Sequence, residues 1–130
     1  MTATKLGFAT AILFVIASAF CIDAADKPLT ESDKIEALIK RMEDLKDATF
    51  IRNGSDHNSK QAARFLRGKW KAQGKEIKTA AEFIDKIASV SSTSGKPYLI
   101  RFKDTGEIKA ADYLKAELKK LHAADDVREH

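Results

Sequence analysis

The chain has few of the residue types that build metal centres and disulfides. It contains one cysteine and three histidines in 130 residues. The cysteine, Cys21, lies in an apolar N-terminal segment that we expect to be removed, which excludes disulfides and cysteine-ligated metals from the mature chain. The histidines, His57, His122 and His130, are far apart and form no His-Glu-x-x-His motif. We therefore predict no metal site and no cofactor.

Motifs that carry catalysis are also lacking. There is no Gly-x-x-x-x-Gly-Lys-Ser/Thr loop, and no triad or dyad spacing is recognisable. The serine- and threonine-rich segment 89–95 follows a predicted helix C-terminus, where the helix dipole disfavours anions, so turn chemistry explains it. Ser94 with Lys96 is a conceivable nucleophile pair, but nothing marks burial or an oxyanion hole there. We predict no catalytic residue.

The N-terminus has the order of a secretory signal. Lys5 precedes an apolar run over residues 6–22, and the small residues Ala24 and Ala25 follow. We expect a signal peptide over residues 1–25, cleaved after Ala24 or Ala25, and a periplasmic or secreted mature chain without a stable membrane span. An uncleaved anchor is the first alternative, but 17 apolar residues fall short of the ~20 that a spanning helix needs. Lipidation at Cys21 is the second, and the bulky Phe20 before it disfavours that processing.

Residues 26–122 are expected to form a single globular domain, followed by a flexible tail over 123–130. Apolar residues at helical spacing predict helices over residues 30–46, 59–73, 79–89 and 110–122. The third predicted helix begins with a capping box, in which Thr79 and Glu82 bind each other's backbone amides. Strands are predicted over 48–52 and 98–102, with a short arm near 107–109. The fold class is α+β, mostly helical, with about four helices packed on a small two- or three-stranded antiparallel sheet.

Positive charge is concentrated in the middle of the chain. Residues 50–78 hold eight basic and two acidic residues, whereas the whole chain has a formal net charge of +4. Such a concentration is not needed for folding and indicates a surface that meets an anion. The candidate anion-binding residues are four on one face of the second predicted helix and one before it: Lys60, Arg64, Arg67, Lys71 and Arg52. The alternative is a solvated face, or pairing with acids of another helix.

Four segments are distinctive when taken in order, and they lie at residues 49–54, 62–70, 79–89 and 91–98. Together they resemble a family of small exported bacterial proteins whose domain has no assigned function. The resemblance implies a location in the bacterial envelope, and it implies no activity, cofactor or catalytic residue. Members of that family often have histidine where this chain has Phe65, so no role of that histidine is transferred to this chain.

The sequence thus predicts a non-catalytic exported envelope protein that binds an anionic envelope component through a basic helix face. Nucleic acid is not expected as a partner, because an exported protein does not meet it. The first alternative is a periplasmic accessory protein that docks on another protein, with the charge serving only solubility. The second is a hydrolase-type enzyme whose site the sequence does not reveal.

Overall fold

The computed structural model describes residues 27–129, so the predicted signal peptide lies outside the described residues. The elements follow in the order α2 (Glu31–Glu43), β1 (Ala48–Arg52), β2 (Ser55–His57), α3 (Ser59–Gln73), η1 (Gly74–Glu76), α4 (Ala80–Glu82), η2 (Phe83–Ile87), β3 (Leu99–Phe102), β4 (Gly106–Lys109) and α5 (Ala110–Arg128). Within these residues, none of the helices has the length and apolar character needed to cross a membrane.

The four strands form one antiparallel sheet in the order β2-β1-β3-β4. The predicted α+β class is confirmed, and the sheet has four strands rather than two or three. The additional strand is β2, which the sequence analysis missed. Asn53 and Gly54 adopt positive φ angles of 52° and 78°, a geometry that closes a tight hairpin. The chain therefore turns back at this pair and adds β2 to the edge of β1.

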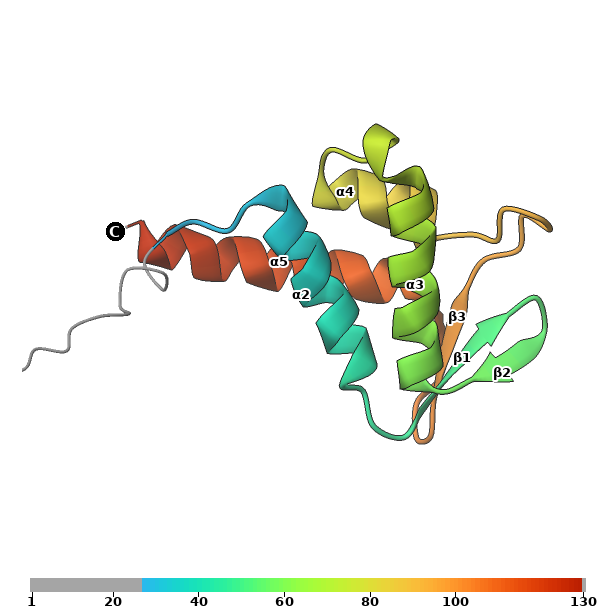
Figure 1. Cartoon of the computed structure of the whole chain (residues 1–130). Coiled ribbons are helices and arrows are strands. Elements are labelled where there is room, and N and C mark those ends of the chain that lie inside the picture. The colour runs from blue at the N-terminus through green and yellow to red at the C-terminus, as the bar shows by residue number, and fades with distance from the viewer. Residues whose placement is uncertain (1–26, 130) are drawn as a thin grey trace, which may run out of the picture.

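One face of the sheet is covered by helices. Phe50 of β1 pairs in register with Ile100 of β3, and both side chains are buried, whereas the neighbouring Arg101 points to the exposed side. Helices α2 and α3 run side by side, and α5 passes behind them (Figure 1). Leu38 of α2 and Leu114 of α5 are completely buried in the core that these elements enclose. The apolar faces predicted from helical spacing are thus the faces that pack.

The third predicted helix is a composite of two short elements. A single α-helical turn, α4, passes directly into the π-helical turn η2, where the Ala88 amide donates to the Phe83 carbonyl over 3.1 Å. The predicted capping box is half right. Thr79 Oγ1 accepts the Glu82 amide at 3.0 Å, but the Glu82 carboxylate binds the Lys78 amide instead of that of Thr79. A carboxylate from another helix, described below, completes this helix start.

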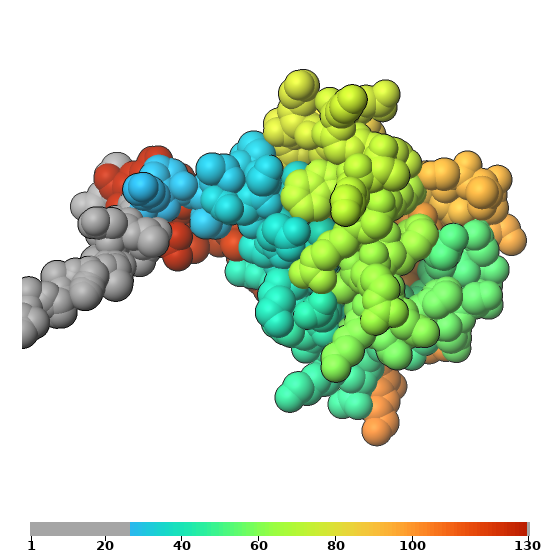
Figure 2. All heavy atoms as spheres, in the orientation of Figure 1, coloured from blue at the N-terminus to red at the C-terminus, as the bar shows by residue number. Residues whose placement is uncertain are grey.

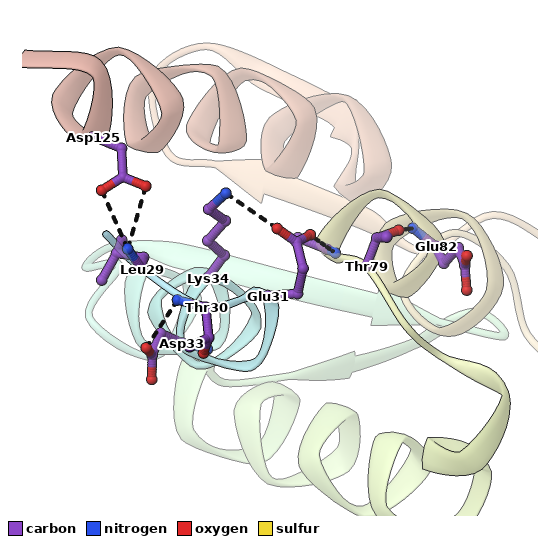
Figure 3. A network of polar contacts seen from close by, with 9 residues as sticks. Leu29, Thr30, Glu31, Asp33, Lys34, Thr79, Glu82 and Asp125 are labelled. Carbon is purple, nitrogen blue, oxygen red and sulfur yellow. Dashed lines mark hydrogen bonds and ion pairs between the residues drawn. The ribbon is translucent and has the colours of Figure 1, made fainter. Parts of the chain in front are cut away.

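The last helix continues to Arg128, so its predicted end at His122 is wrong, and residues 123–128, predicted as part of a tail, belong to this helix. Asp125 explains the extension, because both of its carboxylate oxygens accept the Leu29 amide at 3.3 Å and it is itself buried (Figure 3). This contact holds the start of the described chain against the end of α5. Both ends of residues 27–129 therefore lie at one end of the molecule, and the β1–β2 hairpin lies at the other (Figure 1).

Glu31 joins α2 to the start of α4, and Figure 3 shows it between the two. Its Oε1 accepts the Ala80 amide at 2.8 Å, and its Oε2 binds Lys34 Nζ at 3.1 Å. The Ala80 hydrogen bond, helped by Lys34, holds the pKa of Glu31 below its ordinary value of 4.5, although burial opposes this. The carboxylate thus satisfies an amide that the first helical turn leaves without an intrahelical partner.

We expect Glu31→Gln to lower the free energy of unfolding at pH 7 by about 1 kcal/mol, as the loss of a capping acceptor does. Because the folded-state pKa is depressed, this stabilisation is present above pH 4.5 and is lost as the pH falls through the folded-state value. Urea unfolding at pH 7, 5 and 3 should show the difference from wild type shrinking with pH. Glu76→Gln, a change at an exposed position, is the matched control. A difference of constant size from pH 7 to pH 3 would contradict this prediction.

Candidate anion-binding groove

The five predicted basic residues do not form one surface. Arg52 and Arg64 line the same groove between α3 and the segment that follows η2. Lys60 lies in a different depression, which acidic side chains also line. Lys71 lies in a third, beside Arg67. Only two of the five therefore contribute to one site.

Arg67 is neutralised by acids of the neighbouring helix. Its guanidinium binds Glu36 at 3.3 Å and Glu43 at 3.0 Å, both on α2. The Glu43 hydrogen bond raises the pKa of Arg67, and Arg67 in turn lowers the pKa of Glu43. At this position the structure shows pairing with acids of another helix, which the sequence analysis left open as an alternative. Arg67 connects α2 with α3.

The groove shared by Arg52 and Arg64 encloses about 680 Å³, including space open to solvent. Three cationic side chains, four side chains with hydroxyl groups, one phenylalanine and one glycine line it: Arg52, Arg64, Lys69, Ser91, Ser92, Thr93, Tyr98, Phe65 and Gly68. None of these residues is acidic, so the groove has hydrogen-bond donors and positive charge without an internal counter-ion. A Cβ added at Gly68 would meet nothing within 4 Å, which leaves the helix side of the groove open.

Arg52 is held by an aromatic ring instead of a carboxylate. Its guanidinium carbon lies 3.9 Å from the centroid of the Phe65 ring, and that ring meets Tyr98 edge-on at 5.7 Å. The Arg52 Nε atom is buried and has no hydrogen-bond partner in residues 27–129. A buried donor without an acceptor is costly and uncommon, because most buried polar groups in proteins are paired. The Phe65 ring thus serves as a platform for Arg52.

Lys69 lies at the inner side of the groove and was not among the predicted site residues. Its Nζ donates to the carbonyls of Ile87 and Val90, each at 3.0 Å, and to the Tyr98 hydroxyl at 3.2 Å. Burial, together with the positive charge of Arg52, lowers the pKa of Lys69. The ammonium thus binds carbonyls at and just after the end of η2. The negative end of the helix dipole there disfavours an anion in the following loop, and the positive charge of Lys69 opposes that effect.

The serine- and threonine-rich loop after η2 is fixed beside the β1–β2 hairpin. Ser91 is buried, and its Oγ accepts the amides of Thr93 at 3.3 Å and Ser94 at 3.4 Å. Ser94 Oγ accepts the Lys96 amide and hydrogen-bonds to Asn53, which connects the loop to the hairpin turn. Figure 2 shows the two segments side by side. Structural hydrogen bonds therefore occupy the hydroxyl that the sequence analysis considered as a nucleophile.

Residues 27–129 contain no group of three or more histidine, cysteine or acidic side chains placed to hold a metal ion. The groove instead combines cations and hydroxyls, a donor set suited to an oxyanion such as phosphate or carboxylate.

The sequence analysis did not predict Lys69 or the serine- and threonine-rich loop as parts of the site, and the reason is the same for both. Lys69 belongs to the basic stretch but is off the selected helix face, and no local pattern shows that segments around residues 52, 69 and 92 meet.

Comparison with known proteins places the chain in a family. The model of a family of unknown function, DUF5329, matches residues 29–122. The chain belongs to this family. The DUF5329 match includes every residue that lines the groove. A segment of 68 residues is 46% identical to an uncharacterised protein, YfeK, of Salmonella typhimurium, and covers 52% of this chain. The match spans 57% of the length of YfeK. No solved structure matches this DUF5329 chain.

Proposed function

We propose that this protein is a non-catalytic envelope protein, exported by its N-terminal signal, that binds an anionic envelope component in the groove formed by Arg52, Arg64 and Lys69. The order of basic, apolar and small residues before residue 26 supports export, as does the resemblance to exported bacterial proteins. The observation that carries the binding proposal is the set of three cations without a carboxylate, one of which keeps a buried donor unpaired.

The electrostatics of the groove favour an anion. Outside the groove, Arg101 is compensated by Asp56 and Glu107, and Arg41 by Glu117. In the groove, burial lowers the pKa of Lys69, and the positive charge of Arg52 adds a smaller repulsion in the same direction. A bound oxyanion relieves this repulsion and accepts hydrogen bonds from the guanidinium groups, which match phosphate and carboxylate geometry.

The groove also supports binding rather than catalysis. Its ionisable side chains are two arginines, a lysine and a tyrosine, and burial raises the pKa of the tyrosine, Tyr98. No carboxylate or imidazole lines it to act as a general base. The arginines donate hydrogen bonds at neutral pH, which suits recognition of an oxyanion, whereas Lys69 contributes its charge, because its three N–H groups already have acceptors.

Charge reversal at one exposed arginine tests this proposal. We expect Arg64→Glu to weaken binding to lipopolysaccharide or to vesicles rich in anionic phosphatidylglycerol by roughly tenfold to a hundredfold, because a charge-assisted hydrogen bond is lost. Lys60→Glu is the matched control, since it makes the same charge change at an exposed site on the same helix, outside the groove. Co-sedimentation at 0.05 M and 0.5 M salt, with neutral vesicles alongside, measures both effects.

Three results are informative. Salt-sensitive binding that Arg64→Glu reduces and Lys60→Glu preserves supports the groove. Equal losses in both variants would assign binding to the basic helix face as a whole and overturn the groove as the site. Binding to no anion, with capture of a protein partner that tolerates both changes, would favour the accessory role.

A further inference from the structure

The groove holds more positive charge than a monoanion compensates. Arg52, Arg64 and Lys69 line it, and no acidic side chain does. Within residues 27–129, none of these three cations forms an ion pair with a carboxylate. A ligand with one negative charge would leave two of the positive charges uncompensated, whereas a dianion would leave one. The balance of charge therefore favours a dianionic head group.

Lys69 distinguishes ligands by their charge alone. Its ammonium has three N–H groups, and their acceptors are the carbonyls of Ile87 and Val90 and the hydroxyl of Tyr98. It therefore has no donor left for a ligand and attracts it only through its charge. Because the Coulomb energy of two ions is proportional to the product of their charges, this attraction doubles when a dianion replaces a monoanion. Lys69 is half-buried, so salt screens its charge less than that of an exposed cation.

The two arginines supply the directional hydrogen bonds. Arg52 keeps a buried Nε without an acceptor, and Arg64 and Ser92 are exposed on the groove. A terminal phosphate has three unesterified oxygens, so it can accept hydrogen bonds from both guanidinium groups and from the Ser92 hydroxyl. A phosphodiester has two such oxygens and a single negative charge. Water-sized groups can enter about 360 Å³ of the groove, which is room enough for a phosphate group.

We infer that the groove binds a phosphate monoester in its dianionic form and selects it over phosphodiesters and other monoanions. This inference rests on the proposed function and specifies the head group of its ligand. Both a lipid with a terminal phosphate and a soluble phosphate ester have this chemistry. The test therefore contains an arm for each source.

The first test is calorimetric titration of the purified protein at pH 8 with methyl phosphate and methyl sulfate. The two anions have nearly the same size and tetrahedral shape, but methyl phosphate is a dianion and methyl sulfate a monoanion. We expect methyl phosphate to bind at least about tenfold more tightly, since the second charge interacts with all three cations. Dimethyl phosphate, a phosphodiester, should bind as weakly as methyl sulfate. Equal affinities of the three anions would overturn the inference.

The same titrations at pH 5 provide the second test. A phosphate ester takes up its second proton near pH 6, so a tenfold advantage of methyl phosphate should shrink to about twofold. The ionisable residues of the groove are Arg52, Arg64, Lys69 and Tyr98, and His57 lies in the neighbouring hollow that Arg52 also lines. Methyl sulfate stays a monoanion over this range, so its affinity reports any change in these protein groups. An undiminished advantage at pH 5 would overturn the inference.

Substitution of Arg64 locates the selectivity in the groove. Arg64→Gln removes one of the three charges and should lower the affinity for methyl phosphate more than that for methyl sulfate. Arg64→Lys keeps the charge and should keep the preference for methyl phosphate. Lys60→Gln, at an exposed position of the same helix outside the groove, is the matched control and should also keep it. A preference that Arg64→Gln leaves unchanged would overturn the inference.

Vesicles separate the two sources of the phosphate. Phosphatidylcholine vesicles that contain phosphatidic acid, a phosphate monoester, are compared with vesicles that contain phosphatidylglycerol, a phosphodiester, and with soluble glycerol phosphate. Tighter binding to phosphatidic acid than to glycerol phosphate supports the inference with a lipid as the source, and the reverse order supports it with a soluble ester. Monoanions that bind as tightly as methyl phosphate refute the inference and leave the anion groove in place. Failure of every anion to bind refutes the proposed function and the inference together.

Discussion

Replacing Phe83 with alanine should lower the free energy of unfolding by about 3–5 kcal/mol, the usual cost of truncating a buried aromatic ring. Phe83 is completely buried in the π-helical turn, and its ring meets Trp70 edge-on at 6.0 Å. Small domains have total stabilities of roughly 5–15 kcal/mol, so this loss is a large share of the whole. The melting temperature should fall by more than about 12 °C.

Circular dichroism during thermal and urea unfolding measures this loss. Ile108→Ala is the control, because Ile108 is 38% exposed on the edge strand β4 and its truncation leaves little cavity. We expect the control to change stability by about 0.5 kcal/mol. A Phe83→Ala variant as stable as Ile108→Ala would show that the π-helical turn does not pack as described.

Replacing Lys69 with methionine should have the second-largest effect, on stability and binding together. The change keeps an apolar stem but leaves the carbonyls of Ile87 and Val90 without their donor, which should cost about 2 kcal/mol. It also removes one of the three groove cations, so affinity for inorganic phosphate should fall at least about tenfold.

Lys71→Met is the matched control for this substitution. It makes the same chemical change on the same helix, at an exposed residue outside the groove. Urea unfolding and phosphate titration of both variants complete the comparison. If Lys69→Met unfolds like wild type, its ammonium does not stabilise the end of η2. If it binds phosphate like wild type, the groove does not use this cation.

Local patterns predicted most of the helices and strands. Apolar spacing identified the buried faces, as with Leu38 and Leu114, and Thr79 marked the start of its helix. The π-helical turn was missed because Phe83 and Ile87 lie four residues apart, a spacing that an ordinary α-helix would also bury. Strand β2 was missed because Ser55–His57 is short and polar.

Contacts between distant segments could not be predicted. The sequence cannot show that Arg67 meets Glu43, or that the Leu29 amide binds Asp125, because both pairs depend on how helices pack. The groove has the same origin. Arg52 and Arg64 were selected for their charge, whereas Lys69 and Ser91 enter the site only through the tertiary fold.

The Leu29–Asp125 contact determines where the protein can be attached to a solid support. It places residues 27 and 129 at one end, away from the hairpin and loop that border the groove (Figure 1). A biotin, fluorophore or chip linkage attached beyond either end would leave the groove facing the solution. The protein can therefore be immobilised through a linkage next to residue 27 or residue 129 for binding assays without blocking the groove.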